Sequence, residues 1–124
     1  MAHDIIRDPV KMDKYHHYQK LIRDCFVAHY QRLTSAWLLN LDINMALDDE
    51  QGQYVMFKTG WQGKEYVRYF SLHVALRHGK IYIEEDWTEE GIATDLLRLG
   101  VPREDIVLAF QPPQMRPYTE FAVA

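Results

Sequence analysis

This sequence has a single cysteine, no long run of apolar residues and no excess of positive charge. Because Cys25 stands alone, no disulfide can form within the chain, which suits a reducing compartment. No segment reaches the roughly 18 consecutive apolar residues that a membrane-spanning helix needs. Residues 1–10 also lack the apolar stretch of a signal peptide. We therefore expect a cytoplasmic protein.

The sparse positive charge disfavours direct binding to nucleic acid. The chain has 14 lysines and arginines against 18 aspartates and glutamates, which gives a formal net charge of -4. The basic residues are spread along the sequence, whereas tight nucleic-acid binding depends on lysines and arginines that neutralise phosphates. Neither G-x-G-x-x-G nor G-x-x-x-x-G-K-[ST] occurs, so no glycine-rich phosphate loop is predicted.

The composition fits an ordinary folded domain. The chain has 124 residues, of which 48% are hydrophobic and 26% charged, enough to form a core without disulfides or a structural metal. We assign residues 11–124 to a single domain and residues 1–10 to an N-terminal extension. Neither an internal repeat nor a linker is evident.

Hydrophobic periodicity predicts a long N-terminal helix. Asp8 followed by Pro9 is a helix start signal, and we expect the helix to run to about Arg32. Apolar side chains recur along it at steps of three and four residues, so they form one stripe. One face of the helix should therefore pack on an apolar surface. The stripe consists of Tyr15, Tyr18, Ile22, Cys25, Phe26, His29 and Leu33.

Four segments after the helix have the period of two that is typical of strands. The first covers 39–47 and the second 53–59. A turn at 60–63 leads to a third strand that ends near His78, and 80–85 forms the fourth. Short connections between them predict an antiparallel meander. On the third strand we expect one inward-facing set of side chains, in which a single arginine accompanies five apolar residues, namely Tyr66, Arg68, Phe70, Leu72, Val74 and Leu76.

The remaining residues predict a second helix, a short strand and an extended tail. Thr88 precedes two glutamates, which indicates an N-cap with acidic residues near the positive end of the helix dipole. The segment 100–102, Gly-Val-Pro, is typical of a helix end. Residues 106–110 suit a short strand, and the tail beyond them should pack. The fold class is thus α+β, with a long N-terminal helix packed on an antiparallel meander sheet of about four strands.

Candidate metal ligands and nucleophiles are few. His16 and His17 diverge by about 100° around a helix, so they are poorly placed to share a metal. Cys25 lies on the apolar stripe, where a thiol usually behaves as an inert apolar group. The acidic segment 84–90 offers oxygen ligands for a divalent ion, although carboxylates near a helix start are also expected without one. We predict no catalytic residue and no cofactor, and keep a small metal-dependent enzyme as an alternative.

Several aromatic residues predict a protein-binding surface instead. Trp61, Trp87, Tyr118 and Arg116 are of the types that usually anchor interfaces, and core burial is the competing interpretation for each aromatic residue. The second and third strands also have apolar residues on both faces, and one helix covers only one face. Either the C-terminal helix and tail or a second subunit covers the other face. We predict a homodimer.

The C-terminal half of the sequence resembles the XisI family. The resemblance extends upstream through the Gly60-Trp61-Gln62-Gly63 turn, and more loosely into the N-terminal helix, so that it covers about 11–124. Trp87 departs from the family pattern D-G-T-E, which has glycine at this position. The matching residues follow in order, in the segments 86–93, 100–102, 106–110, 112–113 and 116–124.

This resemblance implies an accessory function. XisI-like proteins are known from cyanobacteria as controlling factors for excision of the fdxN element during heterocyst differentiation, while a separate recombinase cuts the DNA. The expected direct partner is an XisH-like protein, so that association with the recombinase and with DNA is indirect. A direct DNA-binding regulator stays as a further alternative. We predict the partner interface at Asp86, Trp87, Glu89, Glu90, Arg116 and Tyr118.

Overall fold

A computed structural model describes residues 9–34 and 40–124 and has an α+β fold, as predicted. The long N-terminal helix is confirmed, whereas Asp8 and Leu39 lie outside the described residues. The elements are α2 (Pro9–Thr34), β1 (Asp42–Asp48), β2 (Gln53–Gln62), β3 (Glu65–Arg77), β4 (Lys80–Asp86), α3 (Ile92–Arg98), the 3-10 helix η1 (Arg103–Asp105), β5 (Ile106–Leu108) and the 3-10 helix η2 (Pro113–Tyr118).

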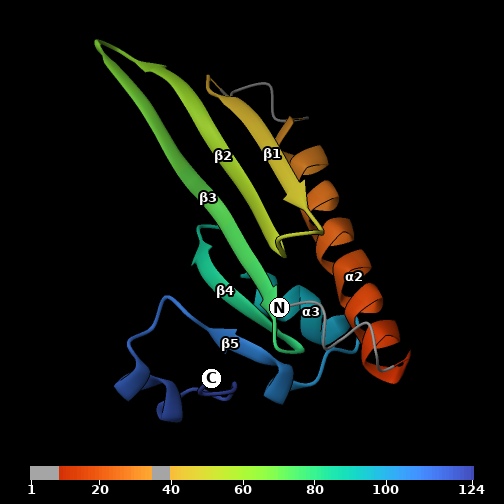
Figure 1. Ribbon diagram of the computed structural model, residues 1–124. Coiled ribbons are helices and arrows are strands. Elements are labelled where there is room, and N and C mark those ends of the chain that lie inside the picture. The colour runs from red at the N-terminus through yellow and green to blue at the C-terminus, as the bar shows by residue number, and fades with distance from the viewer. Residues whose placement is uncertain (1–8, 35–39) are drawn as a thin grey trace.

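The strands form one sheet in the order β1-β2-β3-β4-β5. The first four make the predicted antiparallel meander. The predicted short strand, β5, joins the same sheet by pairing in parallel with β4, which makes five strands where about four were expected. The hairpin of β2 and β3 projects beyond β1 and α2 (Figure 1).

The main core lies between the helices and one face of the sheet. The predicted apolar stripe of α2 is confirmed, with Ile22 and Phe26 fully buried against the sheet residues Tyr54 and Leu72. Residues of α3 belong to the same cluster, so both helices cover this face, which we call the inner face (Figure 1). None of the helices formed by the described residues is long and apolar enough to cross a membrane.

A bulge in β3 overturns part of the predicted inward-facing set. Met56 pairs with Leu72, but Phe57 pairs with Phe70, so Ser71 is an extra residue without a direct partner. Such a bulge reverses the alternation of side chains along a strand. Leu72, Val74 and Leu76 are therefore buried as expected. Tyr66, Arg68 and Phe70 lie on the opposite face instead, and Tyr66 and Phe70 are 51% and 46% exposed.

The hairpin turn and the start of α3 also differ from the predictions. Residues 60–62 continue β2, and the chain reverses at Gly63, whose φ is 64°. Gly60 lies so close to the residue that precedes β1 that an added Cβ would be 2.9 Å from Leu41 Cδ2. The second helix begins at Ile92 rather than after Thr88, because its N-cap is Gly91, with φ 88°. The acidic first turn expected at 89–90 is therefore not part of the helix.

The predicted end of α3 is confirmed. The backbone N–H of Val101 donates to Leu96 O at 3.0 Å and that of Gly100 to Leu97 O at 3.1 Å. These two bonds form a Schellman motif, in which the residue after the helix adopts a left-handed conformation. Gly100 has φ 95°, and Val101 is 2% exposed, so the apolar contact that accompanies this motif is also present.

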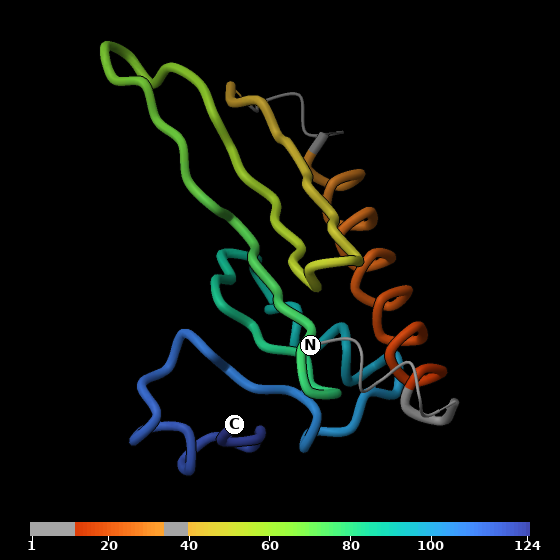
Figure 2. The backbone as a smooth tube through the Cα atoms, in the orientation of Figure 1, coloured from red at the N-terminus to blue at the C-terminus, as the bar shows by residue number. Residues whose placement is uncertain are grey.

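The C-terminal tail packs, as expected, but it is not extended throughout because it contains η2. After η2 the chain returns beside β5, where Ala122 N–H donates to Ile106 O and Ala122 pairs in parallel with Val107 (Figure 2). The tail thereby covers a second, smaller cluster on the face of the sheet opposite the helices. That cluster consists of Ala75, Tyr82 and Val107, with Ala109 and Ala122 packed against it.

Candidate partner-binding surfaces

The six residues predicted to form one interface fall into two groups. Residues 86–90 follow β4, whereas Arg116 and Tyr118 belong to η2. None of the hydrogen bonds or ion pairs that the structure gives for these residues joins the two groups. We therefore consider them separately.

In the first group, Asp86 organises the chain between β4 and α3. Its carboxylate accepts hydrogen bonds from the backbone N–H of Thr88 at 2.9 Å and from that of Ile92 at 2.7 Å. It also accepts one from the Thr88 hydroxyl. Asp86 thus caps α3 although it lies six residues before Ile92 in the sequence. Both of its carboxylate oxygens are engaged in hydrogen bonds within the chain.

The other residues of the first group are available at the surface. Trp87 is 73% exposed, and its indole N–H donates to Glu85 Oε2 at 2.9 Å. Glu89 is exposed, and Glu90 accepts from Arg98 at 3.1 Å in an exposed ion pair. This combination of an exposed tryptophan and two glutamates suits contact with a basic surface of another protein. We call Trp87, Glu89 and Glu90 the acidic corner.

In the second group, Arg116 has a structural role. Its guanidinium donates to three backbone carbonyls of the tail, at 3.1 Å to Ala109, 3.0 Å to Gln111 and 3.2 Å to Val123. These bonds tie both sides of η2 together, so Arg116 is not free to anchor a partner. Tyr118, by contrast, is 84% exposed.

The acidic segment does not form a metal site. The register between β3 and β4 shifts at this point, so that His73 pairs with Glu85 but Val74 pairs with Ile83. Glu84 accepts from Arg77 at 3.3 Å, whereas Asp86 binds the loop before α3. Across 9–34 and 40–124, no three His, Cys, Asp or Glu side chains come close enough to hold a metal ion. The geometry of these described residues therefore gives no support to the alternative of a metal site at 84–90.

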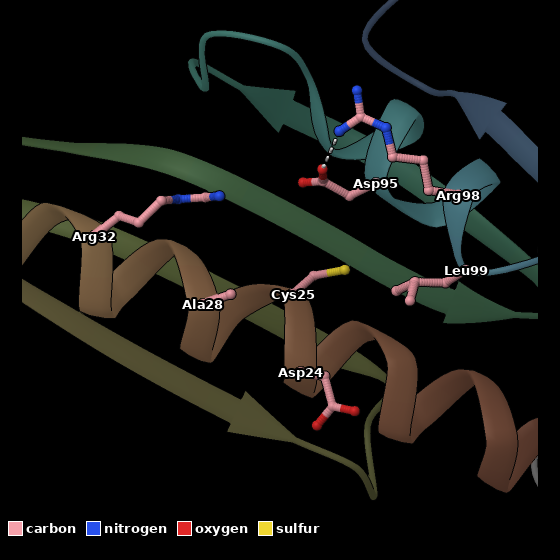
Figure 3. A pocket seen from close by; sticks show the side chains of 7 residues that line it. All are labelled: Asp24, Cys25, Ala28, Arg32, Asp95, Arg98 and Leu99. Atoms are coloured by element: carbon pink, nitrogen blue, oxygen red, sulfur yellow. Dashed lines mark ion pairs between the residues drawn. The ribbon is translucent and has the colours of Figure 1, made fainter.

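An open cavity of about 290 Å³ lies between α2 and α3 (Figure 3). The Cys25 sulfur points toward it, and burial, together with the nearby Asp95 and Asp24 carboxylates, raises the pKa of this thiol to about 12. Since the thiolate is the reactive form, Cys25 is a poor nucleophile at neutral pH. The cavity is lined by Asp24, Cys25, Ala28, Arg32, Asp95, Arg98 and Leu99.

The polar groups of this cavity connect the two helices. His29 Nε2 lies 3.1 Å from Asp95 Oδ2, and Arg98 lies 3.8 Å from the other oxygen of Asp95. Figure 3 shows Asp95 and Arg98 close together on α3. The Asp95 carboxylate is thus balanced by a cation of its own helix and bound to a side chain of α2. This arrangement explains how α3 is held against α2.

A further exposed surface lies on the sheet itself. Among the described residues, no segment packs on the face opposite the helices over β1, β2 and most of β3, and we call this part the open face. Ring pairs cross it between β2 and β3: the ring centroids of Phe57 and Phe70 are 6.4 Å apart, and those of Trp61 and Tyr66 are 5.2 Å apart. Trp61 is 64% exposed. The apolar residues on both faces of these strands were the sequence signal for this surface.

Comparison with known proteins identifies the family. The model of the family described as XisI protein matches residues 12–123. The chain belongs to the XisI family. None of the curated proteins compared with it matches.

Two solved structures of XisI-type proteins, both from Anabaena variabilis ATCC 29413, resemble this fold. One is the fdxN element excision controlling factor XisI, with 34% identity and a TM-score of 0.78, covering 90% of this chain and 99% of that one. The other is a XisI-like protein with 31% identity and a TM-score of 0.80, covering 89% of this chain and 99% of that one. The resemblance that the sequence indicated is confirmed over nearly its whole predicted extent.

Trp87 stands where the resemblance described in the sequence analysis implies a glycine. Among the described residues, His78 is the one non-glycine residue with a positive φ. Trp87 therefore does not need a glycine-like backbone. The left-handed position in this loop is taken by Gly91 instead, and an added Cβ there would lie 3.5 Å from Asp86 Oδ2. Trp87 thus places a large exposed side chain on the acidic corner without a positive φ.

Proposed function

We propose that this XisI-family protein is a non-catalytic controlling factor for the excision of a DNA element of the fdxN type, and that it acts by contact with an XisH-like protein. The name of the 34% identical relative, an fdxN element excision controlling factor, supports the regulatory role. The formal net charge of -4 favours a protein partner over DNA, because phosphates attract basic surfaces.

The observation that carries this proposal is the acidic corner. Trp87 is 73% exposed beside Glu89 and Glu90, and exposed tryptophans in such surroundings are typical anchors of protein interfaces. The glutamates supply the charge that would guide the approach of a basic partner surface and set its register. Tyr118, in η2, is a second exposed aromatic residue of the predicted interface.

Capture of an XisH-like protein tests the proposal. Tagged wild-type chain is compared with the double variant Glu89→Lys, Glu90→Lys and with Trp87→Ala, at low and at moderate salt. We expect both variants to lose most of the captured partner, with the wild-type interaction weakening as salt rises. The matched control is Glu50→Lys, Glu104→Lys, which reverses two exposed charges far along the chain from the acidic corner. Equal capture by the wild type and the acidic-corner variants would refute the site.

The alternatives predict different results. A metal-dependent enzyme requires stoichiometric heat on titration with Mg²⁺, Mn²⁺ or Zn²⁺, and loss of that heat in Glu84→Gln. A direct DNA-binding regulator requires binding of a duplex by the isolated protein, with affinity falling steeply as salt rises. Either result would replace the proposal, because an accessory factor that acts through another protein predicts neither.

A further inference from the structure

The open face exposes an apolar and aromatic patch. Large contiguous apolar patches on soluble proteins generally mark interaction sites, so this face is a candidate contact surface. Every described helix that contacts β1, β2 or β3 does so from the inner face. The patch comprises Ala46 on β1, Val55, Phe57 and Trp61 on β2, and Tyr66 and Phe70 on β3.

The charged residues on the open face indicate which kind of partner would fit it. The strand register aligns Asp42 of β1, Thr59 of β2 and Arg68 of β3 in one row across the sheet. Asp42 and Arg68 are both exposed. Adjacent strands are about 4.8 Å apart, so these two side chains start about 10 Å apart, with Thr59 between them. Neither forms an ion pair with another described residue. The row thus has a negative end and a positive end, each without a counter-ion among the described residues.

We propose that the open face is the contact surface of a homodimer, in which two copies of this chain pack face to face around a two-fold axis that runs along β2. This rotation places β1 of one copy over β3 of the other, so that Asp42 faces Arg68 of the second copy, and the reverse. The same rotation brings the two copies of Phe57 together at the axis. Face-to-face sheets pack about 10 Å apart with their strands nearly aligned, which leaves room for interdigitating aromatic rings.

A second copy fits this surface better than an unrelated partner because the surface is self-complementary. A two-fold interface must offer, on one patch, both members of each contact pair. The row ending in Asp42 and Arg68 meets that condition, as does the aromatic centre formed by Phe57 and Phe70. The inference goes beyond the proposed function and does not depend on it, because the acidic corner is formed by other residues.

Sedimentation analysis of the full chain over a range of concentrations provides the test. We expect the wild type to sediment as a dimer and Phe70→Glu to sediment as a monomer. Asp42→Arg and Arg68→Asp each create two like-charge contacts, and should each raise the dissociation constant at least about tenfold. The double variant Asp42→Arg, Arg68→Asp restores both contacts with the charges exchanged, and should return the dissociation constant close to that of the wild type.

The matched control exchanges an exposed ion pair away from the open face. Lys20→Asp, Asp24→Arg reverses such a pair on α2 and should leave the dissociation constant unchanged. Thermal unfolding of each variant, followed by circular dichroism, separates loss of the dimer from loss of the fold.

Three results would overturn the inference. These are a monomeric wild type at all concentrations, a dimer that Phe70→Glu leaves intact, and failure of the double charge exchange to restore association. Capture of an XisH-like protein by a monomeric wild type, but not by Phe70→Glu, would also overturn it, by assigning the open face to that partner. Loss of capture in the acidic-corner variants alone would leave the dimer intact, so the two proposals fail separately.

Discussion

The two faces of the sheet differ in what covers them, although both carry large apolar side chains. On the inner face Tyr54 and Leu72 are completely buried under α2. On the other face, neighbouring positions on the same strands hold Trp61 at 64% exposure and Phe70 at 46%. Burial of one large apolar side chain stabilises a protein by about 1.5–3 kcal/mol, and over β1 to β3 this stabilisation is realised on one face alone.

The face of the sheet opposite the helices, which we call the outer face, has a covered part and the open face. Over β4 and β5 the C-terminal tail covers it, so that Tyr82 is 8% exposed and Val107 is fully buried. Arg116 holds the tail in place through three backbone carbonyls. The described residues of the tail pack on this patch and not on β1, β2 or the outer part of β3. Apolar character therefore did not decide which side chains of the sheet are exposed. The path of the segments that pack on the sheet decided it.

Truncation of one phenylalanine on each face gives the largest expected contrast. Phe26 is fully buried at the inner face, with its ring centroid 6.4 Å from that of Tyr54. Phe26→Ala should lower the free energy of unfolding by about 3–5 kcal/mol. Phe70→Ala should lower the unfolding free energy of the monomer by about 1 kcal/mol or less, since the ring is already half exposed. Urea unfolding at two protein concentrations measures both values, and equal losses would contradict the distinction between the faces.

Removal of the Arg116 side chain should convert the covered part of the outer face into an open one. Charged hydrogen bonds contribute about 1.5–3 kcal/mol each when partly shielded from solvent, so we expect Arg116→Ala to cost about 2 kcal/mol. Amide hydrogen exchange should increase in β5 and the tail, and remain unchanged in α2. Arg103→Ala, which breaks an exposed pair with Glu120, serves as the control and should have little effect. Unchanged protection in β5 would show that Arg116 does not hold the tail.

The loop after β4 offers a narrower comparison, between an engaged carboxylate and an exposed one. Asp86→Ala removes the acceptor for Thr88 and for the first amide of α3, so we expect a loss of about 1–2 kcal/mol. Glu89→Ala removes an exposed carboxylate and should change stability by less than about 0.5 kcal/mol. Thermal unfolding of the two variants measures this difference. Similar losses would mean that Asp86 is not the cap of α3.

The smallest expected effect concerns a tyrosine hydroxyl at the inner face. Tyr18 donates to Asp105 at 2.5 Å, and burial, together with this bond, raises the pKa of Tyr18 above its ordinary value. Because the folded state keeps the proton that the unfolded state loses, stability is fully present below about pH 10 and falls as pH rises above it. Tyr18→Phe should cost about 1 kcal/mol at neutral pH.

The same variant should also lose stability less steeply at alkaline pH. Urea unfolding between pH 7 and 11 tests both effects together. Tyr66→Phe, at the exposed hairpin, is the control for loss of a tyrosine hydroxyl and should change the stability at neutral pH very little. An alkaline slope that is identical in Tyr18→Phe and in the wild type would contradict the assignment.

Local patterns predicted the parts of the fold in which neighbours in sequence interact. The stripe of α2 that contains Ile22 and Phe26 followed from helical periodicity, and the end of α3 followed from Gly100 and the residues after it. The start of α3 was missed because its cap, Asp86, lies in the preceding strand rather than next to the helix. At the candidate interface, Trp87 and Tyr118 are exposed, as an interface requires. No local sequence pattern indicated that Arg116 donates hydrogen bonds to backbone carbonyls of the tail.

The sequence alone therefore determined the type and order of most elements, the apolar stripe of the first helix and the membership of the XisI family. Periodicity, helix signals and turn glycines are properties of short segments, which can be interpreted without knowing what they pack against. The tertiary structure alone decided which face Phe70 occupies, that Arg116 holds the tail and that one part of the sheet stays open. The bulge at Ser71 and the path of the tail depend on hydrogen bonds between distant segments, and these bonds exist only once the strands have paired.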